Sequence, residues 1–200
     1  GNTITLAISA TGSGTAQTSA AYVLTAADVI SGYANISISK AMLDASGEGT
    51  NKSLTATESN GTNNLSVTTL ASFTYDATLP NIAFTGVIAS DDRINLLEST
   101  NTSALTVSGS YEVGSTVDLT IAGVIRNPQT SASTWSYVLT ATDLANLGQG
   151  TKTIYAHATD ASGNTSVINK TITIDTEAPT IFINTVAGDS TVDLTEKTAW

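Results

Sequence analysis

The sequence contains no cysteine, which excludes disulfide scaffolds, zinc fingers and thiol catalysis together. Any rigidity beyond ordinary packing must therefore come from another source. No apolar run is long enough to cross a membrane. The N-terminus also lacks the basic segment and apolar core of a secretory signal. We therefore expect a soluble piece, without membrane insertion, cut from a longer protein.

Basic residues are also scarce, with seven Lys and Arg against seventeen Asp and Glu, a net charge of −10 and a pI near 4.2. Nucleic acid is excluded as a partner because no basic stripe exists to replace phosphate counterions. An acidic surface can gather divalent cations, or it can simply keep the protein in solution. Net charge alone does not separate these two interpretations.

What the chain does contain is 40% hydrophobic residues, too many for wholesale disorder. Ser, Thr, Asn and Ala fill much of the rest, a composition that suits short exposed strands better than long helices. Two hundred residues allow one or two domains, each with its own core.

An internal repeat of about 99 residues organises the sequence. Asp76–Pro80 returns as Asp175–Pro179, and each copy is followed by an apolar run and then by an acidic box. The boxes are Ser90–Glu98 and Gly188–Glu196. The other half of the unit also repeats, as in these pairs of segments: Gly1–Ile8 with Gly114–Ile121, Tyr22–Thr25 with Tyr137–Thr140, and Ala56–Val67 with Ala156–Val167.

The phase of this repeat predicts three parts: a repeat lacking its first strands over 1–79, a complete repeat over 80–178, and the beginning of a third over 179–200. Within a repeat, apolar residues alternate with polar ones, as in Val117, Leu119 and Ile121. About seven such strands, separated by turn residues, predict an all-β fold of tandem Ig-like β-sandwich domains. The segment Ala141–Leu147 is expected to form one helical turn, and we expect a first strand over about 81–87.

Several motifs of the complete repeat resemble the bacterial Ig-like repeats of large type I-secreted surface adhesins of the biofilm-associated and RTX types. The motifs are Trp135–Leu139, Asp143-Leu144, Leu147–Gly150, Ala158–Asn164 and Asp175–Pro179. The resemblance covers essentially the whole chain and is strongest over 76–200. It implies an extracellular stalk on a bacterial cell surface, with calcium between neighbouring repeats. The first copy departs from the pattern, because Ala20 stands in place of Trp135 and Asn60 in place of Asp160.

Two groups of oxygen-bearing side chains are candidate calcium ligands, since Ca²⁺ takes six to eight oxygen ligands. The first group is Asp76, in the linker entering the complete repeat, with Asp160 and Asn164 in the loop between its last two strands. The second is the acidic box at the exit end with the exit linker: Asp91, Asp92, Asn95, Glu98 and Asp175. Asp189 lies in the matching box of the third copy, with Asp193 and Glu196. The alternative is a set of solvated turns capped by Asp and Asn.

Catalysis is not expected, and neither is sugar binding. His157, the single histidine, falls on the polar face of its strand, and no motif supplies a nucleophile and an orienting acid beside it. Acidic pairs at the linkers could suggest a glycosidase, but they recur at each domain junction, and enzymes rarely repeat an active site in this way. Trp135 could stack on a sugar, but its strand alternation favours a place in the core.

The sequence thus favours calcium-stiffened stalk repeats serving cell adhesion and biofilm formation. The expected partners are neighbouring repeats of the same chain. A second hypothesis is a filament in which the C-terminal segment Thr180–Trp200 completes the first domain of another copy by strand addition. An arbitrary boundary is the alternative explanation of the partial copies, and we favour it over assembly.

Overall fold

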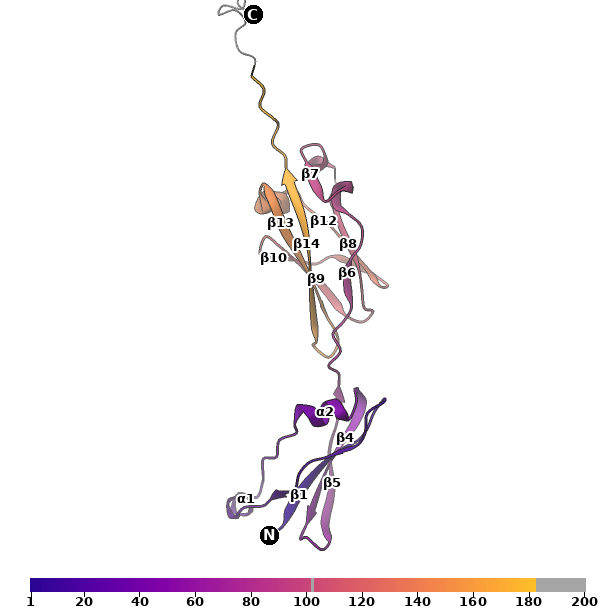
Figure 1. Ribbon diagram of the computed structural model, residues 1–200, viewed down its shortest axis with the longest axis vertical. Coiled ribbons are helices and arrows are strands. Elements are labelled where there is room, and N and C mark those ends of the chain that lie inside the picture. Colours follow the sequence, from indigo (N-terminus) through magenta and orange to yellow (C-terminus); the bar gives the residue numbers. More distant parts are fainter. Residues whose placement is uncertain (102, 183–200) are drawn as a thin grey trace, which may run out of the picture. The chain divides into compact units, whose positions relative to one another are not determined.

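The computed structural model describes residues 1–101 and 103–182 and is built mostly of antiparallel β-strands (Figure 1). This confirms the predicted all-β class. The chain divides into two compact units. Unit 1 comprises Gly1–Pro80 with Thr159–Thr165, and unit 2 comprises Asn81–Ala158 with the chain from Ser166 onward. Each unit is described on its own below.

Unit 1 is a single sheet in the described structure, with strand order β2-β1-β4-β5 and with β3 also paired to β1. Its elements are β1 (Thr3–Ile8), β2 (Gln17–Thr18), β3 (Tyr22–Val23), α1 (Ala26–Ser31), α2 (Lys40–Ala45), β4 (Gly49–Ser59) and β5 (Asn64–Tyr75). The alternation of β1 places Leu6 and Ile8 on the buried face, where they are 5% and 1% exposed.

The long loop of unit 1 is attached to its sheet by a buried lysine. Lys52, on β4, is 0% exposed, and its Nζ donates to Thr11 Oγ1 at 2.7 Å, Ser46 O at 2.8 Å and Gly47 O at 2.6 Å. An ammonium group has three hydrogens, so this set of acceptors satisfies it completely. Nothing in the sequence pattern had singled out this residue.

Unit 2 contains two sheets, with strand orders β10-β9-β13-β14-β7 and β11-β12-β8-β6. Its strands are β6 (Ile82–Phe84), β7 (Arg93–Asn95), β8 (Thr106–Tyr111), β9 (Thr116–Ile121), β10 (Val124–Arg126), β11 (Gln129–Ser131), β12 (Thr134–Val138), β13 (Gly150–Thr159) and β14 (Thr165–Asp175). Its helices are η1 (Ile88–Ser90), η2 (Glu98–Thr100) and α3 (Ala141–Leu147). The expected helical turn is confirmed as α3, whereas the first strand is shorter than predicted because the chain bends at Gly86, which has a φ of 75°.

The core of unit 2 lies between these sheets. Leu119 and Ile154 from one sheet are 0% exposed, and Val107 and Trp135 from the other are 1% exposed. The Trp135 ring meets Phe84 edge-on, with centroids 5.3 Å apart and an interplanar angle of 76°. Trp135 is therefore a core residue, as its alternation predicted, and offers no stacking surface to a sugar.

A glycine makes room for this tryptophan. A Cβ added to Gly109, on β8, would lie 2.0 Å from Ala83 O and 2.4 Å from Trp135 Cε2. Gly109 pairs with Trp135 on one side and with Phe84 on the other. The missing side chain therefore lets the indole lie flat across β8.

Candidate functional site

The turn between β13 and β14 is built around Asp160. Its Oδ1 accepts from the backbone N–H groups of Ser162 at 2.8 Å and Asn164 at 2.9 Å, and its Oδ2 accepts from Asn164 Nδ2 at 2.9 Å. Burial alone would raise the pKa of Asp160, but these hydrogen bonds stabilise the carboxylate and lower it. The turn therefore holds an ionised carboxylate in a fixed orientation.

Asp76 lies against this turn. Its Oδ2 accepts from Ser162 Oγ at 2.8 Å, and its backbone carbonyl accepts from Asn164 Nδ2 at 3.3 Å. The structure thus brings together the three residues of the first candidate group. The equivalent turn in the first copy is one residue tighter and is capped by an amide, since Asn60 Oδ1 accepts from the N–H groups of Thr62 and Asn63.

The second group gathers where β14 ends. β14 and β7 pair in parallel, with Asp175 opposite Asn95. Asn95 and Glu98 cap each other, since each backbone N–H donates to the other's side chain, at 3.1 and 3.0 Å. A hollow of about 250 Å³ is lined by four of the predicted residues together with three neighbours: Asp91, Asn95, Glu98 and Asp175, with Arg93, Ile94 and Thr173.

Asp92 does not join this group. Its Oδ2 forms an ion pair with Lys170 Nζ at 2.8 Å, and its Oδ1 accepts from the backbone N–H of Ile88 at 2.8 Å. These bonds turn the carboxylate toward η1 and β14, so Asp92 fixes the loop instead of facing the hollow. Asp189, in the third copy, lies outside the described residues.

The donors of both groups are carboxylate, amide and carbonyl oxygens, the ligands that Ca²⁺ prefers. Within residues 1–101 and 103–182, no group of three or more His, Cys, Asp or Glu side chains is arranged so that it could hold a metal ion. The two groups thus match calcium in the chemistry of their donor atoms but not in their present arrangement, because hydrogen bonds within the chain hold these side chains.

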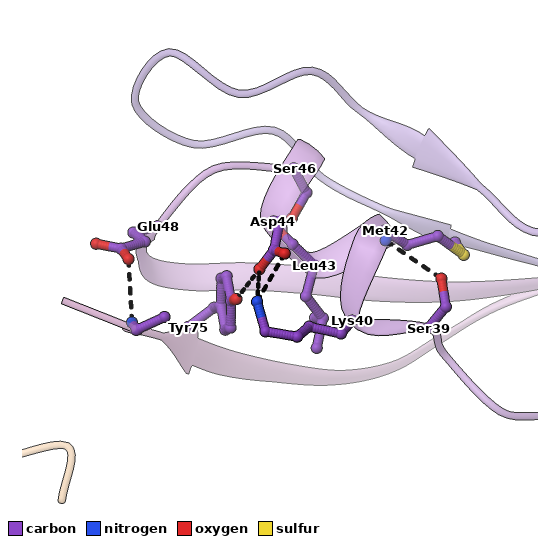
Figure 2. Close-up of polar contacts among 9 residues, drawn as sticks. Ser39, Lys40, Met42, Leu43, Asp44, Ser46, Glu48 and Tyr75 are labelled. Atoms are coloured by element: carbon purple, nitrogen blue, oxygen red, sulfur yellow. Dashed lines mark hydrogen bonds and ion pairs between the residues drawn. The ribbon is translucent and has the colours of Figure 1, made fainter. Parts of the chain in front are cut away.

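The end of α2 carries a third polar cluster, in unit 1 (Figure 2). Lys40 Nζ lies 2.8 and 2.7 Å from the two oxygens of Asp44, and Tyr75 donates its hydroxyl to the same carboxylate. Hydrogen bonds from Lys40 and then Tyr75 lower the pKa of Asp44. Because a lysine already pairs with this carboxylate, the cluster serves to fix α2 against β5.

Sequence reasoning missed the most buried charge of unit 2. The Asp143 side chain is 0% exposed and forms an ion pair with Arg126 at 2.8 Å. Its Oδ2 also accepts from the Tyr137 hydroxyl at 2.8 Å and from the Thr140 N–H at 2.9 Å. The spacing Thr140-x-x-Asp143, a capping-box pattern at the start of α3, is the signal that could have revealed it.

The same network recurs in unit 1 without its cation. Asp28 Oδ2 accepts from the Tyr22 hydroxyl at 2.9 Å and from the Thr25 N–H at 2.9 Å. Hydrogen bonds from Thr25 and then Tyr22 lower the pKa of Asp28, which is half-buried. The two copies of the repeat thus share a tyrosine–aspartate–threonine brace, and only the second copy buries it.

His157 has no catalytic surroundings in the described structure. It is half-buried on β13, and its Nε2 lies 3.2 Å from Thr120 Oγ1 on the neighbouring strand. An isolated histidine–threonine contact lacks the acid that would orient a general base.

No helix in the described parts of the chain is both long enough and apolar enough to span a membrane.

Comparisons with known proteins found likeness only among solved structures. No protein-family model matches the chain, and neither does any curated protein sequence. One similar structure is from a 1.5-MDa bacterial ice-binding adhesin studied for its retention at the host cell surface. It is 22% identical with a TM-score of 0.41, and the match covers 88% of this chain and 54% of that one.

Two further structures are similar. A Ca²⁺-stabilized adhesin with which an Antarctic bacterium reaches out and binds ice is 23% identical, with a TM-score of 0.37 and 94% and 45% of the two chains covered. A bacterial immunoglobulin-like domain of the M. primoryensis ice-binding adhesin is 28% identical, with a TM-score of 0.36 and 50% and 100% covered. This chain thus spans about half the length of the first two. These structural neighbours come from bacterial ice-binding adhesins, and one of them is an Ig-like domain.

Proposed function

We propose that this chain is a stretch of non-catalytic, extracellular stalk repeats from a large bacterial surface adhesin. Calcium held at the linkers stiffens the stalk, which serves adhesion and biofilm formation. The observation that carries the proposal is the position of the two linker aspartates, which stand one repeat apart in the sequence. Each linker aspartate, Asp76 or Asp175, lies beside oxygen-bearing side chains of a turn or an acidic box.

Under this proposal the ligands of the first site come from Asp76, Asp160 and Asn164, and those of the second from Asp91, Asn95, Glu98 and Asp175. Calcium supplies a positive charge that offsets the repulsion between neighbouring carboxylates. The chain's own contribution is to hold the oxygens ready, by the turn at Asp160 and by the mutual caps of Asn95 and Glu98. Asp92 stays with Lys170 and is not a ligand in this arrangement.

Calorimetric titration of the chelator-treated protein with CaCl₂ tests the proposal. We expect saturable binding that weakens at least about ten-fold at the affected site in Asp160→Ala or Asp175→Ala, because each change removes a charged ligand. Asp118→Ala, which removes a carboxylate of β9 that belongs to neither group, is the matched control and should bind as the wild type does. Small-angle scattering with calcium and with chelator reports the stiffening. Absence of binding, or an unchanged maximum dimension, would refute the stalk mechanism.

A second candidate function is assembly by strand addition between copies, and the exposure of α1 favours it. Val29 and Ile30 are 71% and 87% exposed in unit 1. In α3, which occupies the same place in the repeat, Leu144 packs against the core and Leu147 is 6% exposed. The outer edge of β5 pairs with no strand in the described structure, whereas the equivalent edge of β14 pairs with β7. Unit 1 therefore presents an apolar surface and a free strand edge that strands from another copy could cover.

Sedimentation velocity over a hundred-fold range of protein concentration tests this assembly. If copies add strands to unit 1, the mean mass rises with concentration, and Val29→Asp with Ile30→Asp abolishes the rise by placing charges on the apolar surface. The paired change Val138→Asp and Tyr155→Asp, at exposed apolar positions of unit 2, is the control and should leave the rise intact. A single monomeric species at every concentration excludes assembly.

A further inference from the structure

The linker that leaves unit 1 is held by a glutamate from another part of the chain. Glu48 lies in the turn between α2 and β4. Its Oε1 accepts from the backbone N–H of Ala77 at 3.1 Å, and its Oε2 accepts from Thr78 Oγ1 at 2.6 Å. Asp76 adds a bond along the same stretch, since its Oδ1 accepts from the Thr78 N–H at 3.1 Å.

Unit 2 holds the residue after its own linker aspartate in the same way. Gln149 lies in the turn between α3 and β13. Its Oε1 accepts from the backbone N–H of Thr176 at 3.0 Å, and its Nε2 donates to Thr176 Oγ1 at 2.6 Å. Both bonds are made to Thr176, the residue that directly follows Asp175.

The two holding residues occupy the same position of the repeat. Glu48 stands between Gly47 and Gly49, as Gln149 stands between Gly148 and Gly150. In both units a side-chain oxygen accepts from the N–H of the residue that follows the linker aspartate. Glu48 is charged and Gln149 is neutral. What they share is an acceptor oxygen at the end of a side chain with two methylene groups.

We infer that Glu48 and Gln149 are linker-positioning residues. They fix the residue after Asp76 and Asp175 and thereby set the direction in which each linker aspartate leaves its strand. The hold is made entirely by atoms of this chain and requires no metal. Only its consequence for ion binding rests on the proposed function, in which these two aspartates are calcium ligands. The linkers are then anchored at their first residues even under chelation.

Amide hydrogen exchange, followed by NMR on the whole chain in excess chelator, tests the hold directly. In Glu48→Ala, exchange at Ala77 should accelerate by about five-fold, the loss expected for one hydrogen bond. Glu48→Gln keeps the acceptor oxygen and should preserve the wild-type rate. The Ser162 amide, which is bound by Asp160, is the internal control and should not change. Equal Ala77 rates in all three proteins would overturn the inference for unit 1.

Gln149 separates positioning from electrostatics because its removal changes no charge. Gln149→Ala should accelerate exchange at Thr176 by about five-fold. It should also weaken calcium binding at the Asp175 site by a similar factor, and Gln149→Glu should restore both. Accelerated exchange with unchanged calcium affinity would contradict the positioning role. If the wild type binds no calcium, the proposed function fails, whereas the exchange rates alone still decide whether the hold exists.

Discussion

Replacing Asp143 with alanine should destabilise unit 2 by about 3 kcal/mol, the lower end of the cost of removing one partner from a buried ion pair, because the Arg126 side chain is 24% exposed and water can reach it. The carboxylate is fully buried and serves Arg126, Tyr137 and Thr140 together. Its loss leaves a guanidinium, a phenol and a helix N-terminus without their acceptor. Chemical denaturation followed by the fluorescence of Trp135, which lies in the core of unit 2, measures the change.

Asp28→Ala is the matched control. It removes the same brace in unit 1, where the aspartate is only half-buried and its described partners are Tyr22 and Thr25, without an arginine. Water can replace the lost bonds there, so the effect should be clearly smaller. A loss in Asp143→Ala no larger than in Asp28→Ala would show that burial of the brace contributes nothing.

The same carboxylate predicts how stability depends on pH. Burial raises the pKa of Asp143, but bonds from Thr140, Tyr137 and Arg126 outweigh it and hold the pKa below its usual 3.8. A lowered pKa in the folded state stabilises the fold at all pH values above about 4, and this stabilisation is lost as the pH falls through the folded-state pKa. The gap in unfolding free energy between wild type and Asp143→Asn should therefore be constant above pH 4 and shrink below it.

Gly109→Ala should destabilise unit 2 by about 3 kcal/mol, at the upper end for overpacking a core. The added methyl would overlap both the Ala83 carbonyl of β6 and the Trp135 ring. Neither neighbour can give way easily, because one is backbone in a paired strand and the other is a buried indole locked against Phe84. Relief therefore requires β8 to separate from β6 or the tryptophan to leave its place.

Thermal unfolding with near-ultraviolet circular dichroism measures this effect, since the indole signal should change along with the midpoint. Ser110→Ala, at the next position of β8 and on its other face, adds no atoms and should stay within about 0.5 kcal/mol of wild type. If Gly109→Ala is as stable as Ser110→Ala, the strands around β8 accommodate the added methyl group without loss of unfolding free energy, and the prediction is wrong.

Strand alternation and repeat phase predicted much of the fold. The period of two located the strands that carry Leu119, Ile154 and Trp135, because a residue that alternates with polar neighbours in a two-sheet structure must face the core. The length of β6 could not be read from this pattern, since apolar residues continue past Phe84 to Val87 and Ile88 although the chain already bends at Gly86, with a φ of 75°. A glycine within an apolar run does not by itself show whether the strand bends there or continues.

The candidate site was predicted in its location and only partly in its members. Repeat phase was enough to bring Asp175 to the acidic box and Asp76 to the Asp160 turn. It could not separate Asp91 from Asp92, because neighbouring residues in a turn point in different directions and the choice depends on Lys170, which is distant in sequence. Glu48 and Gln149 were missed for a similar reason. Each accepts from a backbone amide some thirty residues away. Every residue except proline has such an amide, so the sequence does not mark which one is bound.

Lys52 gives unit 1 a property that the linker sites do not share. Its ammonium group occupies a cage of three oxygens, two of them main-chain carbonyls, of the kind that often surrounds a bound ion. Here the positive charge belongs to a side chain of the protein itself, so neither dilution nor a chelator can remove it. The loop around this ammonium group should therefore keep its shape at any calcium concentration, whereas the proposed linker sites depend on calcium from solution.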